Sequence, residues 1–392
     1  MKRFHRWMAG LAAFVMLMCG VWAAGRAEAD VALFAVNVGK GDALLVKAGD
    51  WVGLIDAGKA RAMGRVAGTL RTLGIEHLDG VFLTHTDGDH AEGLDWLAKS
   101  DIRVDHWYAS AMYTGVKEKK HPAVKAAALR ETEVEWLRRG DALDLGGGAS
   151  LKVLAPASLF QDKDDNNSLV MMLQSDRGRI LLTGDMELPQ EAELLSLGDD
   201  LACDVLKAPN HGDDDTLSDA FARAASARVA LISTDSVEKP GTPDPGVVAR
   251  LQAAGSRVVV TQDAGLGQWI TLTGDGVEVR PVDIDAPEIS GLALRLVDPG
   301  DDLVAVGNDG AAAVDLTGCY LVSDKGDELF AFPEGTAIAP GQTLTIGTNT
   351  TEGGFDLLWD DKKVVSKKKR DVITLYDAWG RALDSRDNGL AE

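Results

Sequence analysis

The chain has 392 residues, which is too long for one ordinary domain and suits a core of about 250 residues joined to one of about 100. Hydrophobic residues make up 45% of it and charged residues 26%, a composition typical of a folded globular protein and not of a disordered one. The formal net charge of -21 predicts long-range repulsion of polyanions and argues against tight non-specific binding of nucleic acid. A metal centre could still supply local positive charge.

The first thirty residues have the pattern of a secretory signal. Lys2 and Arg3 precede an apolar run at residues 8–24, and Ala27-Glu28-Ala29 follows as a small-x-small cleavage site. We expect cleavage after Ala29, so that residues 1–29 are a signal peptide and the mature protein is secreted without a transmembrane segment. The alternative is an uncleaved membrane anchor, because the apolar run is nearly long enough to span a bilayer.

Residues 30–281 alternate short β-rich runs with helix-like stretches. Several of the strand candidates are apolar at consecutive positions, which is expected when both faces of a sheet are covered. This pattern predicts an α/β layered domain. The helix-like stretches lie at residues 61–73, 93–99, 189–197 and 245–254.

Beyond a polar, proline-containing linker at residues 282–289 the helix-like patterns disappear. Short strand candidates follow, separated about every ten residues by glycine, proline, aspartate and asparagine turns, and they predict an all-β sandwich at residues 290–392. Cys203 and Cys319 fall in different predicted domains and Cys19 lies in the signal, so we expect no structural disulfide.

The strongest chemical signal is a group of four potential metal ligands, His85, Asp87, Asp89 and His90, directly after the apolar run at residues 81–83. Side chains at i, i+2, i+4 and i+5 of a strand-end loop can turn imidazole and carboxylate groups inward around two adjacent cations. Core packing does not call for so many titratable groups at one strand end. The sequence therefore predicts a metal site here, with a capped loop as the alternative.

Two later strand ends supply further ligands. Asp185 follows the strand candidate at residues 179–182 and could bridge two metals, and His211 follows the one at 204–206 and could complete a coordination shell. An aspartate after glycine is by itself typical of a turn. The carboxyl ends of strands are where α/β sheets generally build sites, so the three clusters together indicate one centre.

Six motifs in this order resemble the metallo-β-lactamase-fold domain of the ComEC competence DNA-uptake proteins. The resemblance covers about residues 31–281. It implies a four-layer αββα fold, two divalent metal ions and metal-assisted hydrolysis, with phosphodiester bonds as the leading substrate and nucleic acid as a partner. The motifs are Asn37–Ala43, the Leu-Ile-Asp-Ala-Gly at 54–58, His85–His90, Asn166–Val170, the Leu-Leu-Thr-Gly-Asp at 181–185, and Leu206–Gly212.

The resemblance also implies how the ligands divide between the two ions. The bridging residue would be Asp185, with His85 and Asp87 on one ion and Asp89, His90 and His211 on the other. Asp89 and Asp185 would be the catalytic carboxylates. Because carboxylate is harder than imidazole, the site should accept Mn²⁺ or Mg²⁺ as well as Zn²⁺. Two ions roughly 3.5–4 Å apart can activate a shared water and neutralise charge on a phosphodiester oxygen.

Three positions depart from that family's pattern. Asn37 stands where aspartate is usual, and Asn210 and Thr242 each stand where histidine is usual. A histidine in place of Thr242 would lie near the metals and could act as a general acid, so its replacement predicts a changed substrate or slow turnover. We expect activity because the principal ligands are present. The alternatives are hydrolysis of another small ester or phosphate, and a binding protein that keeps the fold without the chemistry.

The C-terminal part resembles the lamin tail domain, an immunoglobulin-like sandwich found on many secreted bacterial proteins. The matching positions are mostly turn and core residues. The resemblance implies this fold and a role in contact with a cell surface or polymer. If the chain is a binding protein without catalysis, this module would dock it there. The positions are Asp315–Leu321, Phe332–Thr336, Pro340-Gly341 and Asp371–Asp377.

Two features receive the simpler interpretation. The basic run Lys367–Arg370 could touch a nucleic-acid backbone or an anionic wall polymer, but one loop of like charge is more often a solvated loop. His77, His106 and His121 lie outside the motif strand ends, and we expect them at the surface and not among the ligands.

Overall fold

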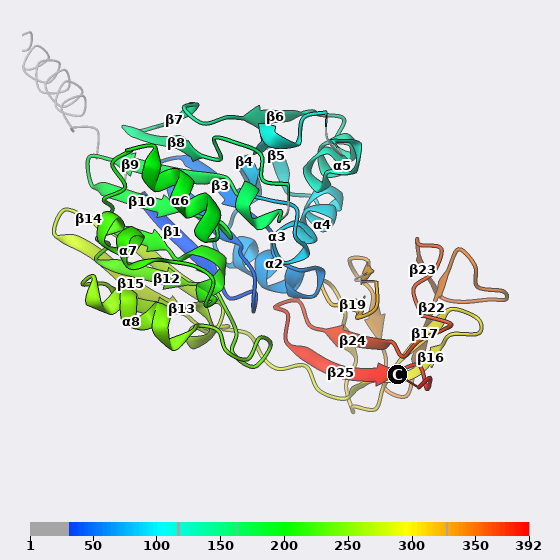
Figure 1. Ribbon diagram of the computed structural model, residues 1–392. Coiled ribbons are helices and arrows are strands. Elements are labelled where there is room, and N and C mark those ends of the chain that lie inside the picture. The colour runs from blue at the N-terminus through cyan, green and yellow to red at the C-terminus, as the bar shows by residue number, and fades with distance from the viewer. Residues whose placement is uncertain (1–30, 116–117, 162, 327, 392) are drawn as a thin grey trace, which may run out of the picture.

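The computed structural model describes residues 31–115, 118–161, 163–326 and 328–391, which are shown in Figure 1. The predicted signal peptide at residues 1–29 lies outside the described residues. Within the described part of the chain, no helix combines the length and the apolar character that crossing a membrane requires.

Residues 31–282 form two facing β-sheets. The first sheet has eight strands, and its parallel half runs from β3 to β6. In order across the sheet the strands are β15 (Gly276–Val282), β14 (Gly267–Thr273), β1 (Val31–Val36), β2 (Leu44–Ala48), β3 (Trp51–Ile55), β4 (His77–Leu83), β5 (Arg103–Ser110) and β6 (Val134–Leu137).

The second sheet has seven strands, of which β10 to β13 are parallel. The parallel halves of both sheets place strand ends, and the loops that follow them, along a common edge, which is where the motif residues lie. In order the strands are β13 (Arg257–Val260), β12 (Val229–Ile232), β11 (Val205–Lys207), β10 (Gly178–Leu182), β9 (Val170–Ser175), β8 (Ala149–Ala155) and β7 (Ala142–Gly146).

Three apolar layers hold the sheets and helices together. Leu33, Phe82 and Leu182 belong to the cluster between the two sheets, which explains the consecutive apolar positions of the strands. The other two clusters lie between each sheet and its own helices, so the predicted αββα architecture is confirmed. The helices are α2 (Met63–Thr72), α4 (Gly93–Lys99) and α5 (Pro122–Leu129) on the first sheet, and α6 (Leu188–Ser196), α7 (Asp219–Ala225) and α8 (Pro245–Ala253) on the second.

The C-terminal part is all β, as predicted, with Val306, Leu321 and Leu375 in its core. Its two four-stranded sheets and one short pair contain β16 (Leu292–Asp298), β17 (Leu303–Asn308), β22 (Thr343–Thr348) and β23 (Leu357–Trp359); β20 (Leu329–Ala331), β19 (Tyr320–Ser323), β24 (Val372–Tyr376) and β25 (Ala382–Asp387); and β18 (Val314–Asp315) with β21 (Ala337–Ile338). Among the described residues Cys203 and Cys319 are buried and free, one in each part.

The C-terminal sandwich packs on helix α2 of the first part, beside which it lies in Figure 1. Tyr320 contacts Met63, and two helix glycines make the close approach possible. A Cβ on Gly64 would lie 2.5 Å from the Tyr320 ring, and one on Gly68 would lie 2.8 Å from the Trp379 ring. Glycine is therefore required at both positions for this packing.

Candidate metal centre

The loops after β4, β10 and β11 bring most of the predicted ligands together. His85 and His90 follow β4, Asp185 follows β10, and His211 lies in the short helix η5 (Pro209–Gly212) after β11. All four side chains are buried, the three imidazoles completely. Burial of this many titratable groups without ions of opposite charge is costly, so the cluster has a chemical purpose.

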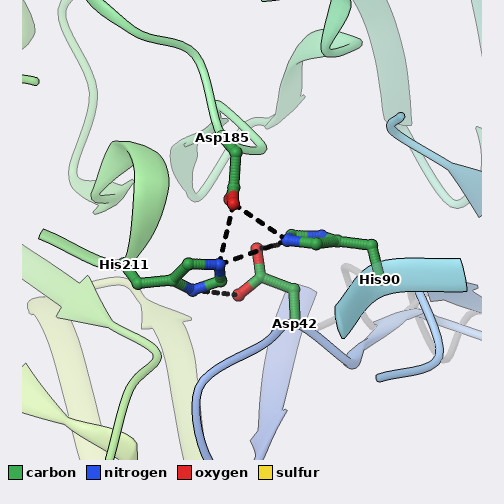
Figure 2. A group of neighbouring side chains, drawn as sticks. All are labelled: Asp42, His90, Asp185 and His211. Atoms are coloured by element: carbon green, nitrogen blue, oxygen red, sulfur yellow. Dashed lines mark hydrogen bonds and ion pairs between the residues drawn. The ribbon is translucent and has the colours of Figure 1, made fainter. Parts of the chain in front are cut away.

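One group of ligand atoms forms around Asp185 (Figure 2). Its Oδ2 lies 2.8 Å from His211 Nε2 and 3.1 Å from His90 Nε2, and the two Nε2 atoms are 3.2 Å apart. Asp89 joins this group from the side, with its Oδ2 at 3.6 Å from His211 Nε2. Of the predicted ligands, His90, His211 and Asp185 are thus in one group together with Asp42, and Asp89 lies at its edge.

The hydrogen bonds behind the rings fix which nitrogen of each imidazole is free. His90 Nδ1 lies 2.7 Å from Asp56 Oδ2, and His211 Nδ1 lies 2.8 Å from the carbonyl oxygen of Ser233. A carboxylate and a carbonyl only accept, so both Nδ1 atoms carry a proton, and Nε2 is the nitrogen of each ring whose lone pair a metal ion would take. These two lone pairs point at the same place beside Asp185.

His85 is oriented in the same way through Thr84. The Thr84 hydroxyl donates to Asp56 Oδ2 at 2.7 Å, so its oxygen accepts from His85 Nδ1 at 3.1 Å. His85 Nε2 is then free, and it is buried with no hydrogen-bond partner among the described residues. One carboxylate, Asp56, therefore orients His90 directly and His85 through Thr84, which is the arrangement typical of metal-binding histidines.

A second group of ligand atoms forms around His85. Its Nε2 lies 3.5 Å from Oδ1 of Asp165, which begins the short helix η4 (Asp165–Asn167), and Asp185 completes the group. Asp185 Oδ1 is buried and lacks a hydrogen-bond partner within the described residues. Asp185 therefore belongs to both groups of ligand atoms, and each group contains histidine and carboxylate side chains that could hold a divalent metal ion.

Asp87 lies elsewhere. Its side chain is exposed, and no ligand group of the described residues includes it, whereas Asp165 lies against His85 Nε2. The assignment of Asp87 as a ligand stays a prediction. Asp165 escaped the sequence analysis because it ends a loop rich in aspartate, where one carboxylate looks like the next. The only signal was its place directly before the Asn166 motif.

A buried ion pair underlies the centre. Lys207 Nζ lies 2.5 Å from Asp42 Oδ2 and donates to the carbonyl oxygen of Gly184 at 3.3 Å, and both charged side chains are buried. Asp42 faces the Nδ1 side of His211, at 3.9 Å, away from the Nε2 lone pair (Figure 2). Asp42 and Lys207 therefore support the centre from behind. In the sequence, the one feature that could have indicated this pair is a lysine, Lys207, at the end of an apolar strand.

The centre has an excess of negative charge. Burial lowers the pKa of His90, but Asp185 and Asp56 outweigh it and raise that pKa well above the usual range. Burial and the carboxylates of Asp87 and Asp185 raise the pKa of Asp165 to about 7. The carboxylates outnumber the two lysines, so the site attracts cations. The groups are Asp42, Asp56, Asp89, Asp165 and Asp185, against Lys40 and Lys207.

Two of the departures from the family pattern have structural roles in the loops. Asn37 Nδ2 donates to the carbonyl oxygen of Ala264 at 2.9 Å. The Thr242 hydroxyl is buried and lies 2.7 Å from the hydroxyl of Thr234.

One surface prediction was wrong. His121 is only 3% exposed, because it lies between the rings of Tyr113 and Trp136, at centroid distances of 4.7 and 5.4 Å. Burial lowers its pKa to about 4, so this ring is neutral. His106 is exposed and His77 is half-buried, each paired with a nearby carboxylate.

Comparison with known families assigns both parts of the chain. Residues 36–237 match the model of the metallo-beta-lactamase superfamily, and residues 285–389 match that of the lamin tail domain. Among solved structures, the metallo-beta-lactamase fold protein YhfI from Bacillus subtilis is 14% identical with a TM-score of 0.39, and the match covers 61% of this chain and 98% of that one.

Curated relatives include a ComE operon protein and a competence protein. ComE operon protein 3 of Bacillus subtilis is 26% identical over 282 residues, covering 66% of this chain and 35% of the relative. Competence protein ComA of Neisseria gonorrhoeae is 25% identical over 266 residues, covering 66% of this chain and 36% of the relative. The chain thus matches about a third of the length of these relatives.

Proposed function

Because the chain belongs to the metallo-β-lactamase superfamily, we propose that it is a binuclear metal-dependent hydrolase that cleaves phosphodiester bonds, with DNA as the leading substrate. The observation that carries this proposal is the convergence of three free imidazole Nε2 atoms on Asp185, whose Oδ2 lies 2.8 Å from His211 and 3.1 Å from His90. A structural core has no use for three buried lone pairs facing one carboxylate.

The residues of the centre would have different roles in this reaction. Divalent cations bound here would supply a water activated as nucleophile and would neutralise charge on the phosphodiester. Asp185 would hold the two ions at a fixed separation, His90, His211 and Asp89 would bind one, and His85 with Asp165 the other, with Asp87 as the predicted further ligand. Lys40, whose Nζ lies 2.5 Å from Asp89 Oδ2, brings a positive charge to the opening of the site, where it could contact a phosphate oxygen.

Two observations favour DNA as substrate. Two of the relatives have names that refer to DNA uptake or exchange, competence protein ComA and recombination protein 2. The carboxylate-rich ligand set suits Mn²⁺ or Mg²⁺ as well as Zn²⁺, the ions with which phosphodiesters are commonly cleaved. These names belong to longer proteins, so they support the substrate class and do not establish it.

Export and surface contact belong to the same proposal. The signal pattern at residues 1–29 supports secretion, and the lamin tail domain supports docking to a cell surface or an anionic polymer. In the folded sandwich Lys325, distant in sequence, lines one pocket together with Lys363, Lys367 and Lys368. Glu328 and Asp371 line the same pocket, so the four lysines exceed the carboxylates there, which supports contact with an anionic partner.

The proposal is tested with purified residues 30–392, supplied with Mn²⁺, Mg²⁺ or Zn²⁺ and given single- or double-stranded DNA. Cleavage that disappears in Asp185→Ala would support a metal-dependent nuclease. Lack of cleavage with every metal would sink the nuclease proposal. Bound metal with hydrolysis of a small ester alone would favour the small-ester alternative, and lack of stoichiometric metal would favour a binding protein.

A further inference from the structure

A second cluster of positive groups lies beside the metal centre, and a side chain of the protein itself occupies it. The carboxylate of Glu238 forms ion pairs with Lys59 Nζ and Arg61 Nη2, and its Oε2 accepts a hydrogen bond from the backbone N–H of Lys40 at 3.1 Å. Lysine, arginine and a loop amide form the donor set that proteins use to bind phosphate. The carboxylate therefore stands where an anion of that kind would fit.

The cluster adjoins the metal centre through one residue. Lys40 donates its backbone N–H to Glu238, while its side-chain Nζ reaches Asp89 Oδ2 at 2.5 Å. Asp89 in turn lies 3.6 Å from His211 Nε2. Lys40 therefore links the anion cluster to the metal centre.

The positive side of the cluster is firmly held. Lys59 and Arg61 flank Ala60 in and before the short helix η1 (Ala60–Ala62), where the Ala60 N–H donates to Glu92 Oε2 at 3.1 Å. The carbonyl oxygen of Arg61 accepts a hydrogen bond from the Tyr320 hydroxyl at 2.7 Å. Both domains thus fix the backbone that carries these two cations.

The carboxylate side lies in a turn with few contacts beyond itself, chiefly a hydrogen bond from the Ser236 N–H to Gln262 Oε1 at 2.8 Å. Glu238 follows β12, in a turn where Asp235 Oδ1 accepts from the N–H groups of Val237 at 2.8 Å and Glu238 at 3.4 Å. The neighbouring Val237 is 89% exposed, so the turn protrudes into solvent. Such a turn can move away without unfolding a sheet or a helix.

We propose that Lys59, Arg61 and the Lys40 amide bind the phosphate next to the scissile one, and that Glu238 occupies this place until a phosphate displaces it. This inference rests on the proposed phosphodiesterase function, because a substrate with one phosphate has nothing to place there. The site favours polymers over small diesters. In a chain of net charge -21, it also keeps the cations neutralised until a polyanion is at short range.

The test is the binding of a short fluorescein-labelled single strand of DNA to the full chain, followed by anisotropy over a series of KCl concentrations. In Glu238→Gln the cations lose their internal partner and bind DNA without displacing it. The strand should therefore bind several-fold more tightly at low salt, and the slope of log K against log [KCl] should steepen, because the cations are no longer neutralised in the free protein.

The matched control is Glu135→Gln, which removes the same charge from an exposed residue of β6 at the far edge of the sheet. Equal affinity and slope in the two variants, or weaker binding by Glu238→Gln, would overturn the proposal. The reciprocal variant is Lys59→Gln in the wild-type background, compared with Lys47→Gln on an exposed position of β2. It should flatten the salt slope, and a slope equal to that of Lys47→Gln would also count against the site.

The two proposals fail separately. DNA binding is read without turnover, whereas cleavage is scored on a gel. If Glu238→Gln binds DNA more tightly but the protein cleaves no DNA, the anion-site proposal stands and the nuclease proposal is wrong. If the protein cleaves DNA but the salt slope of DNA binding is unchanged in Glu238→Gln and Lys59→Gln, the nuclease proposal stands and the anion-site proposal is wrong.

Discussion

The hydroxyl of Tyr320, in the C-terminal domain, donates a hydrogen bond to the carbonyl oxygen of Arg61 at 2.7 Å and accepts one from the Gly64 N–H at 3.2 Å. Arg61 belongs to the segment that presents cations beside the metal centre. The lamin tail domain therefore does more than extend the chain: it holds part of the edge of the candidate active site.

Tyr320→Phe should loosen this contact while it keeps the ring. Two hydrogen bonds are lost and the Gly64 N–H is left unpaired, so we expect the free energy of unfolding to fall by about 1–3 kcal/mol. Chemical denaturation measures it. Tyr376→Phe, whose ring stacks on Tyr320 with centroids 5.0 Å apart, is the control for loss of a hydroxyl. An equal effect in both variants would show that the interdomain bonds contribute nothing.

Asp185→Asn should lose both metal ions together, because one carboxylate serves both ligand groups. Metal content measured by mass spectrometry of the purified protein should fall from two equivalents to well below one. Asp95→Asn, an exposed residue paired with Lys99, is the control. Retention of one full equivalent by Asp185→Asn would contradict a shared bridging ligand.

Asp56→Asn and Thr84→Val should separate the two halves of the centre. Asp56 accepts from both His90 and Thr84, whereas Thr84 orients only His85. Loss of such a supporting hydrogen bond typically lowers metal affinity about 10–100-fold. Metal titration should show two weakened sites in Asp56→Asn and one in Thr84→Val. Identical titration curves would refute this division.

Lys207→Met should destabilise the protein strongly, because it leaves the buried Asp42 carboxylate without its partner at 2.5 Å. Breaking a buried pair in this way costs about 3–5 kcal/mol. The double variant Lys207→Met with Asp42→Asn should recover much of that loss, since the buried charge is gone. Denaturation curves of the three proteins measure this, and additive losses would argue against a coupled pair.

The two described thiols should be inert in the folded protein. Burial raises the pKa of Cys203 and of Cys319 to about 12, so near pH 8.5 the folded state holds far less thiolate than an exposed thiol does. Because the thiolate is the reactive form, this rise in pKa corresponds to about a thousandfold slower alkylation. The raised pKa also means that these thiols favour folding below pH 9 and lose that contribution as the pH rises towards 12. Peptide mass spectrometry after iodoacetamide treatment gives both rates, and fast labelling of the native protein would contradict the burial.

The sequence predicted the position of the metal centre better than it predicted the elements and residues around that centre. The β4, β10 and β11 ends were recognisable because each short apolar run stops at a polar motif. Helices α5 and α7 and strands β5 to β8 and β15 were not predicted. Asp165 and the burial of His121 were missed because both depend on partners distant in sequence, His85 for one and the rings of Tyr113 and Trp136 for the other.

The two glycines of helix α2 carry information beyond this chain. Gly64 and Gly68 stand one turn apart, and each leaves room for an aromatic ring of the C-terminal domain. A solvent-facing helix gains stability from alanine at such places, so a glycine pair has a cost that only an attached neighbour repays. This glycine pair can therefore be recognised in the sequence of the first domain alone. It would distinguish a domain shaped to pack against a C-terminal sandwich from one that has no such neighbour.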